Sequence, residues 1–262
     1  MKLFAFTIDL ETDYAGCMEN SSIFRDLKQI EEVLSTLSSL NVKITVFTVG
    51  NILETFPEVI KLFEKHNCEF EAHSYSHNFK HPDSEYEIKK SREAFYNYFK
   101  EYPRGYRAPR GDISNDGIKM LEKHGFLYDS SITPAFFPNP FRYLFHKKKA
   151  HYIDGTNIME IPVTPVSPLR LASSMSYIKM IGIDLFIKLS NLTEMPDTIC
   201  FGSHLHDFII KENSLNKLFP LWKLLYGINK HKGMEFCEKY LNFIQEQGYK
   251  FCFMSEIYNL HK

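Results

Sequence analysis

Apolar residues along the chain switch repeatedly between the spacing of a strand and the spacing of a helix. Leu3–Asp9 predicts a buried strand, and the positions from Ile23 to Leu40 then form one apolar face with three- and four-residue spacing. This face predicts a helix, which either Ser21 or Ser22 can cap. Lys43–Val49 alternates and is rich in β-branched residues, so it predicts the next strand.

The same alternation continues to the end of the chain. Helices are expected at Glu54–Lys65, Glu85–Lys100, Asn115–His124, near Tyr177–Leu192 and at Met234–Gln247. Strands are expected at Cys68–Ala72, Gly105–Ala108, Phe126–Asp129, near Asn157–Ile161, at Thr198–Ser203 and at Tyr249–Met254. About seven β/α units in one domain, residues 1–262, fit either an α/β barrel or an open doubly wound sheet. Two stretches, residues 133–156 and 208–232, break the pattern and are interpreted as insertions that shape a binding site.

Composition is that of an ordinary globular protein, with 24% charged and 44% hydrophobic residues, which excludes a disordered chain. The net charge of −1 gives no basic footprint, so we expect no nucleic-acid partner. The five cysteines form no CxxC pair, and the apolar run after Lys2 is too short for a signal peptide or a membrane span. A cytoplasmic location is therefore expected, and the oligomeric state stays open.

Residues with metal-binding chemistry follow two of the expected strands. His73 and His77 are four apart just after a strand, so they can meet on one side of a helical turn and bind one metal; two unrelated histidines fit equally well. Asp9 and Glu11 end the first strand and face the same way if the chain is extended there. Such a pair fits a site with one metal ligand and one general base. It fits an acidic loop that caps a helix equally well.

Two further segments carry candidate chemistry. Arg107 stands between Gly105 and Gly111, where its guanidinium can hold a carboxylate in the ionised form, although a simple Pro- and Gly-containing turn is favoured in isolation. His204 and His206 follow another expected strand and precede an aspartate, which favours a role in proton transfer.

Taken in order, these segments resemble the motifs of the polysaccharide deacetylase family, which is carbohydrate esterase family 4 or the NodB homology domain. The resemblance is carried by Thr7-Ile8-Asp9, by His73-Ser74-Tyr75-Ser76-His77 as a full His-(Ser/Thr)-x-x-His motif, by Arg107-Ala108-Pro109, by Tyr128-Asp129-Ser130-Ser131, by Met159-Glu160-Ile161-Pro162 and by Ser203-His204. It implies a distorted (β/α)7 barrel of the polysaccharide deacetylase type, and a divalent metal, most often zinc. It also implies hydrolysis of an N-acetyl group on a sugar, with release of acetate.

Carried over residue by residue, the resemblance makes His73 and His77 metal ligands, Asp9 the catalytic base, Arg107 its charge partner and His204 the general acid. The second aspartate of the family motif is Leu10 here. The carboxylate moves on to Glu11, an Asp-x-Glu arrangement that some branches of the family share, so Glu11 is assigned as the third ligand. Which of Asp9 and Glu11 takes the metal, and which of His204 and His206 is the acid, stay open.

The expected substrate is an N-acetylated amino sugar of a surface polysaccharide, a lipopolysaccharide or a precursor, which a nucleotide or lipid can carry. Rival functions are an allantoinase-like or cyclic-imide hydrolase on the same fold, and a catalytically silent carbohydrate-binding relative. Phe219–Tyr226 with Lys217 and Lys223 is compatible with contact at a membrane surface, but an ordinary buried helix or a dimer contact is favoured.

Overall fold

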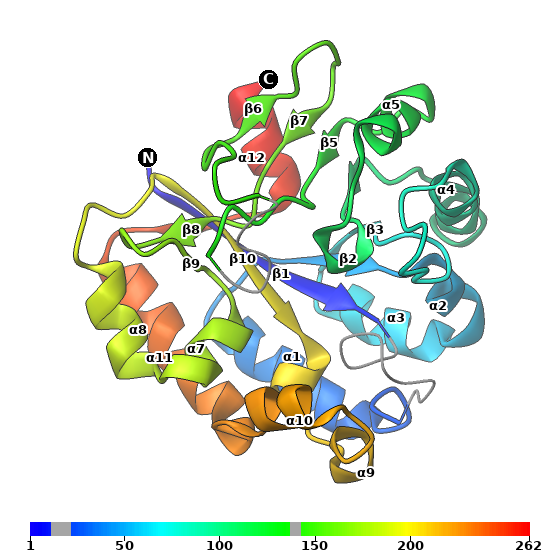
Figure 1. Ribbon diagram of the computed structural model, residues 1–262. Helices are drawn as coiled ribbons and strands as arrows, with labels where there is room; N and C mark the ends of the chain where they lie inside the picture. Colours follow the sequence, from blue (N-terminus) through cyan, green and yellow to red (C-terminus); the bar gives the residue numbers. More distant parts are fainter. Residues whose placement is uncertain (12–21, 137–142) are drawn as a thin grey trace.

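A curled sheet of mainly parallel strands forms the centre of the fold (Figure 1). The computed structural model describes residues 1–11, 22–136 and 143–262. Neighbouring strands follow the order β10-β1-β2-β3-β4-β5-β7-β6, with β11 also paired to β1, and among these pairs only β6–β7 is antiparallel. After β7 the chain returns to β10, where the Thr164 N–H donates to the Cys200 carbonyl at 3.0 Å. The predicted distorted barrel is confirmed.

The strands of this sheet are β1 Leu3–Leu10, β2 Ile44–Thr48, β3 Glu69–Ala72, β4 Gly105–Tyr106, β5 Tyr128–Asp129, β6 His151–Tyr152, β7 Met159–Glu160, β10 Thr198–His204 and β11 Lys250–Phe251. A separate small hairpin joins β8 Pro165–Val166 to β9 Leu171–Ala172. The helices are α1 Leu27–Ser39, α2 Gly50–Thr55, α3 Pro57–Lys65, α4 Glu85–Phe99, α5 Asn115–Lys123, α7 Met175–Ile181, α8 Ile183–Ser190, α9 Glu212–Leu215, α10 Pro220–Gly227, α11 Gly233–Glu246 and α12 Met254–His261. Among the described residues, no helix combines the length and the apolar character needed to cross a bilayer.

Several helix boundaries differ from the expected ones for local reasons. The first helix begins at Leu27, because the Asp26 side chain caps it by accepting from the Gln29 N–H; Ser22 does not cap it. Ser21 lies outside the described residues. The expected helix 54–65 is two helices, since Pro57 starts the second at a position that needs no N–H donor.

Two expected elements near the C-terminus are also shorter than predicted. The helix near 177–192 is interrupted by Gly182, whose φ of 86° does not fit a helix. The strand predicted for Tyr249–Met254 is only Lys250–Phe251, and Met254 already begins α12. Both differences leave the order of strands and helices around the barrel unchanged.

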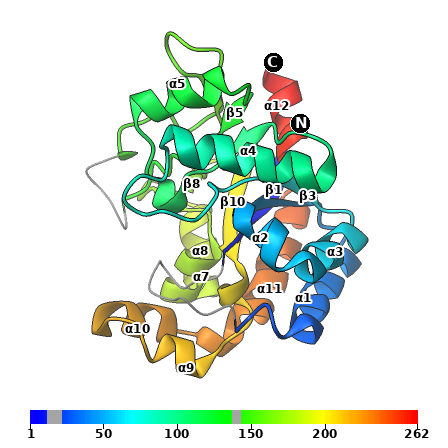
Figure 2. The ribbon, with the colours of Figure 1, turned by 90° about the vertical axis from the view of Figure 1, so that its right-hand side faces the viewer.

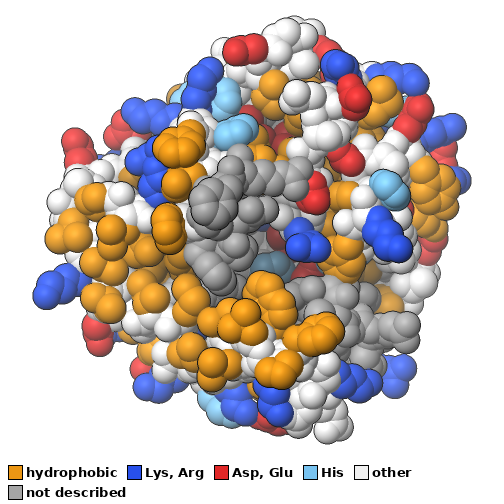
Figure 3. All heavy atoms as spheres, viewed as in Figure 1, with side chains coloured by type: hydrophobic (Ala, Val, Ile, Leu, Met, Phe, Trp, Pro, Cys, Tyr) orange, Lys and Arg blue, Asp and Glu red, His pale blue; other side chains and the backbone are white. Residues whose placement is uncertain are grey.

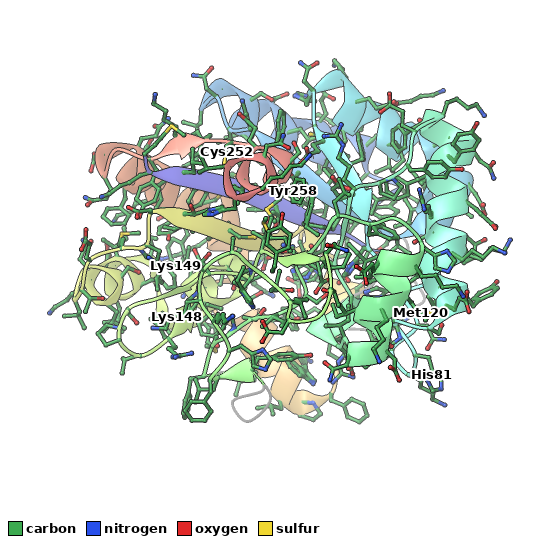
Figure 4. All side chains as sticks on the ribbon, turned by 90° about the horizontal axis from the view of Figure 1, so that it is seen from above. His81, Met120, Lys148, Lys149, Cys252 and Tyr258 are labelled. Atoms are coloured by element: carbon green, nitrogen blue, oxygen red, sulfur yellow. The ribbon has the colours of Figure 1, made fainter. Side chains whose placement is uncertain are left out.

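Side chains of β1 alternate between two cores. Phe4, Phe6, Ile8 and Leu10 pack in the large core that also takes residues of α1 and α11. Leu3 and Ala5 point into the barrel, where they join apolar side chains of β5, β7 and β10. Helix α12 covers the end of this inner core, and Figure 4, which looks onto that end, labels Cys252 and Tyr258 there. The inner row of β1 continues through Thr7 and Asp9 to the opposite end of the barrel.

A buried carboxyl group lies in β3 inside this packing. Glu71 accepts hydrogen bonds from the N–H groups of Arg104 and Gly105 and from the Tyr128 hydroxyl, at 2.6 to 2.9 Å. Gly105 is required here, because a Cβ atom would lie 2.2 Å from the Tyr128 ring. Burial, with the nearby charge of Glu69, raises the pKa of Glu71 to about 8 despite these hydrogen bonds.

Replacing Glu71 by glutamine is expected to change how stability depends on pH. The pKa of Glu71 is higher in the folded chain, at about 8, than its ordinary value of 4.5, so the folded state binds more protons between these values. The wild type should therefore lose stability as pH rises from 4.5 to 8, by up to about 1.4 kcal/mol per pH unit from this group. Glu71→Gln lacks this loss. The free energy of unfolding measured in urea, taken as variant minus wild type, should therefore be larger at pH 8 than at pH 5. A difference between the two proteins that does not change with pH would contradict this expectation.

Candidate active site

The candidate catalytic residues come together at the carboxyl ends of the parallel strands. Asp9 lies near the end of β1 and pairs in register with His204 at the end of β10, and Glu11 directly follows β1. His73 directly follows β3, and Arg107 directly follows β4. Because parallel strands of a barrel end on one side, residues far apart in sequence reach a common site there.

Glu11, His73 and His77 form a compact group. One Glu11 carboxylate oxygen lies 2.7 Å from His77 Nε2 and 3.6 Å from His73 Nε2. One ligand atom from each residue lies within 4.8 Å of the others. Leu10 is fully buried in the outer core, whereas Asp9 and Glu11 both face His204, as the alternation of the strand predicts. Glu11, one residue after Leu10, therefore places a carboxylate beside the two histidines.

The segment His73–His77 is a loop, so the expected helical turn is wrong. Ser74 and His77 have φ values of 59° and 58°, which a continuous helix does not allow. The Glu87 carboxylate of α4 holds the loop, since it accepts from the N–H of Ser76 at 2.7 Å and from its hydroxyl at 2.6 Å. The two histidines therefore converge through a turn that a distant side chain fixes.

A backbone contact orients the ring of His73. Its Nδ1 lies 2.7 Å from the Arg107 carbonyl oxygen, which can only accept, so Nδ1 carries a hydrogen and Nε2 is the nitrogen that faces Glu11. Burial alone would raise the pKa of Glu11, but the neighbouring His77, His73 and His204 hold it well below its ordinary value. One carboxylate and two imidazoles form the kind of three-ligand set found in catalytic zinc sites, so these residues fit a divalent metal.

Arg107 holds the second carboxylate, Asp9. Its Nη1 donates to Asp9 at 2.6 Å and to the Thr7 hydroxyl at 2.9 Å, while Nε and Nη2 donate to the carbonyl and hydroxyl of Ser130, each at 3.0 Å. The guanidinium also lies over the ring of Phe47, 4.0 Å from its centre. Burial would raise the pKa of Asp9, but the charges of Arg107, His73 and His204 together lower it. Asp9 is therefore kept as a carboxylate.

Only one of the two candidate acids faces these carboxylates. His204 Nε2 lies 3.8 Å from Asp9 and 3.9 Å from Glu11. His206 is buried, with its ring stacked on that of His204 at 4.6 Å and in edge-on contact with the ring of Tyr226 at 5.3 Å. The geometry therefore favours His204 over His206 as the group that reaches a substrate.

Asp207 is a partner of His204 that the sequence interpretation did not assign. Its carboxylate accepts from the backbone N–H of His204 at 2.9 Å, and the same oxygen lies 3.6 Å from the ring nitrogen Nδ1 of His204. Burial lowers the pKa of His204, but the hydrogen bond with Asp207 and the charges of Glu11 and Asp9 raise it to about 9. Lys179 of α7 lies 3.7 Å from the other Asp207 oxygen. The three-residue spacing of His204 and Asp207 was a usable signal, whereas nothing in the sequence pointed to Lys179.

The fold and this geometry define a barrel with a candidate metal centre at the carboxyl ends of its strands. Residues 26–128 match the family model for polysaccharide deacetylases. A peptidoglycan deacetylase from Helicobacter pylori is 33% identical over 107 residues, which are 39% of this chain and 36% of that protein. The match thus spans only about a third of the length of that curated relative.

Solved structures share the fold along nearly the whole chain. A protein from Mycobacterium smegmatis that is assigned to the polysaccharide deacetylases has a TM-score of 0.63 at 19% identity, covering 98% of this chain and 90% of its own. The PuuE allantoinase has a TM-score of 0.62 at 13% identity, and this match also covers 98% of this chain and 90% of its own. Residues 26–128 are therefore similar in sequence to the polysaccharide deacetylase family, and the solved structures show that nearly the whole chain shares the fold.

Removing one imidazole is expected to abolish metal binding at this site. His77→Ala leaves one carboxylate and one imidazole, too few ligands to retain zinc against dialysis. Elemental analysis after zinc loading should find about one equivalent in the wild type and almost none in the variant.

The matched control is His81→Ala, four residues further on and outside the group. It should keep the metal, and both variants should keep the circular dichroism of the wild type. A folded His77→Ala protein that still holds one equivalent of zinc would contradict the assignment.

Proposed function

We propose that this chain is a zinc-dependent N-deacetylase, with residues 1–262 acting as one catalytic domain. It is a hydrolase of carbon–nitrogen bonds other than peptide bonds, and it removes an acetyl group from an amino sugar. The observation that carries the proposal is the group of Glu11, His73 and His77 directly beside a carboxylate that a buried arginine keeps ionised. The match of residues 26–128 to the polysaccharide deacetylase family model supports the same activity.

The two carboxylates have different surroundings, which supports different roles. Glu11 faces the imidazoles of His73 and His77 and would be the third metal ligand. Asp9 is tied to Arg107, so it is the base that accepts a proton from the attacking water. A divalent metal bound by the ligand set would polarise the acetyl carbonyl and lower the pKa of a coordinated water.

His204 would act in the step in which the amine leaves. Its Nε2 faces the two carboxylates, so it can give a proton to the amine nitrogen as the bond to the acetyl carbon breaks. Asp207 orients the ring from the Nδ1 side and favours its protonated form. Protonation of the amine is needed because an unprotonated amine anion is a very poor leaving group.

The proposed substrate is an N-acetylated amino sugar of a surface polysaccharide, a lipopolysaccharide or one of their precursors. The Helicobacter pylori relative is a peptidoglycan deacetylase, which supports a sugar polymer as the substrate class. A cytoplasmic location remains part of the proposal, together with a nucleotide- or lipid-linked form of the sugar.

Zinc-loaded wild type is expected to release acetate from N-acetylglucosamine oligosaccharides, and Asp9→Asn to lose most of this activity. The amide keeps the size of the side chain but accepts a proton poorly, so kcat should fall by about 10²–10⁴-fold while bound zinc stays. Acetate and zinc are measured on the same samples.

Asp116→Asn, at an exposed aspartate of α5, is the control and should keep full turnover. Full activity of Asp9→Asn would overturn the base assignment. Ring opening of allantoin or a cyclic imide, without acetate release from any N-acetylated sugar, would overturn the deacetylase proposal in favour of its rival.

His204→Asn is expected to reduce kcat far more than His206→Asn, by about 10²–10⁴-fold, because only His204 reaches the reacting groups. The loss should shrink with an aryl acetate ester, since a phenolate leaves without being protonated. Equal losses on the amide and the ester, or a larger loss in His206→Asn, would contradict the role of His204 as the acid.

A further inference from the structure

Helix α10 leaves large apolar side chains in contact with solvent. None of its residues is buried, and the exposed fractions are 73% for the preceding Phe219, 63% for Leu221 and 65% for Leu224. The ordinary buried helix favoured from the sequence is therefore wrong. Figure 3 shows hydrophobic side chains gathered over α10 and the neighbouring α7 and α8.

The other side of α10 is anchored to the protein close to the candidate active site. Trp222 and Tyr226, one turn apart, pack against the small buried cluster of Leu215 and Leu218. Tyr226 also meets the ring of His206 edge-on at 5.3 Å. Figures 1 and 2 place α10 at the edge of the molecule, where β10 ends. One side of α10 therefore packs against the protein, and the other side is exposed to solvent.

The outer side combines apolar and basic residues. Leu221 and Leu224 are three residues apart and share one face, with the exposed Lys223 beside them. Residues 208–232 contain five lysines and only one acidic residue, Glu212. Within the described part of the chain, Lys217 and Lys223 have no ion-pair partner, whereas Glu212 is paired with Lys230.

We propose that α10, with Phe219 and the lysines at positions 217 and 223, docks on the surface of an anionic phospholipid bilayer. The apolar side chains enter the headgroup region, and the lysines face the lipid phosphates. A second copy of this chain is a poorer occupant, because a two-fold interface sets the patch against itself and would gather the lysines of both copies, all of one charge, in a single interface. Lysine is also depleted in the cores of protein–protein interfaces.

Docking in this way turns the end of β10 and His204 toward the headgroups. A sugar carried on a membrane lipid would then reach the candidate catalytic residues without leaving the bilayer. This consequence for the substrate rests on the proposed function, whereas the docking itself does not.

The test is co-sedimentation of the purified protein with vesicles of phosphatidylglycerol and phosphatidylcholine, compared with phosphatidylcholine alone. The wild type should bind the anionic vesicles, and binding should weaken as salt rises. Leu221→Ser/Leu224→Ser should lower the partition coefficient about tenfold or more, because apolar burial in the headgroup region is lost. Lys217→Gln/Lys223→Gln should lower it by about fivefold per lysine at low salt.

The matched control is Leu260→Ser, an exposed leucine of α12, which lies away from α10 in Figure 1. It should bind as the wild type does, and circular dichroism shows whether each variant is folded. No binding of the wild type to anionic vesicles, or unchanged binding of the folded double leucine variant, overturns the proposal. A dimer in size-exclusion chromatography that the leucine variant dissociates overturns it in favour of a second copy. Because no substrate is present, a failed acetate assay leaves this result standing.

Discussion

The buried contact between Arg107 and Asp9 organises the candidate site. It joins the first strand to the chain after β4, residues that are 98 positions apart. A buried guanidinium needs a counter-charge and a partner for each N–H group, and losing one member of such a pair typically costs about 3–5 kcal/mol. Because the remaining donors of Arg107 are taken by Thr7, Ser130 and the Cys200 sulfur, Asp9 is held in one place. His73 and His77 therefore contact the next inward-facing carboxylate, that of Glu11.

The alternation of side chains along β1 explains how one strand serves both stability and chemistry. Its outward row packs under the helices, and its inward row begins in the inner core and ends in the site. Leu10 is on the outward row, so an aspartate there would be buried among apolar side chains, whereas Glu11 reaches His73 and His77. The departure from the family motif at position 10 is therefore compatible with a complete ligand set.

Local sequence patterns predict much of this structure, and the failures have a common cause. The order of strands and helices, and the meeting of Asp9, Glu11, His73 and Arg107 at strand ends, follow from periodicity and from the geometry of parallel strands. The loop conformation at His73–His77 depends on Glu87 of α4, and the position of Asp207 depends on Lys179 of α7. Neither contact can be predicted from the residues next to it in the sequence. The sequence indicated an apolar segment at Phe219–Tyr226, but only tertiary contacts decide whether such a segment is covered.

The most direct test of this account is a crystal structure of the zinc-loaded protein with diffraction data collected on both sides of the zinc absorption edge. The account predicts one strong anomalous peak, with the Glu11 carboxylate, His73 Nε2 and a His77 ring nitrogen at about 2.0–2.2 Å. Asp9 should remain on Arg107 and outside the coordination sphere. A zinc peak held by Asp9 in place of Glu11, or one centred on His204, His206 and Asp207, would contradict it.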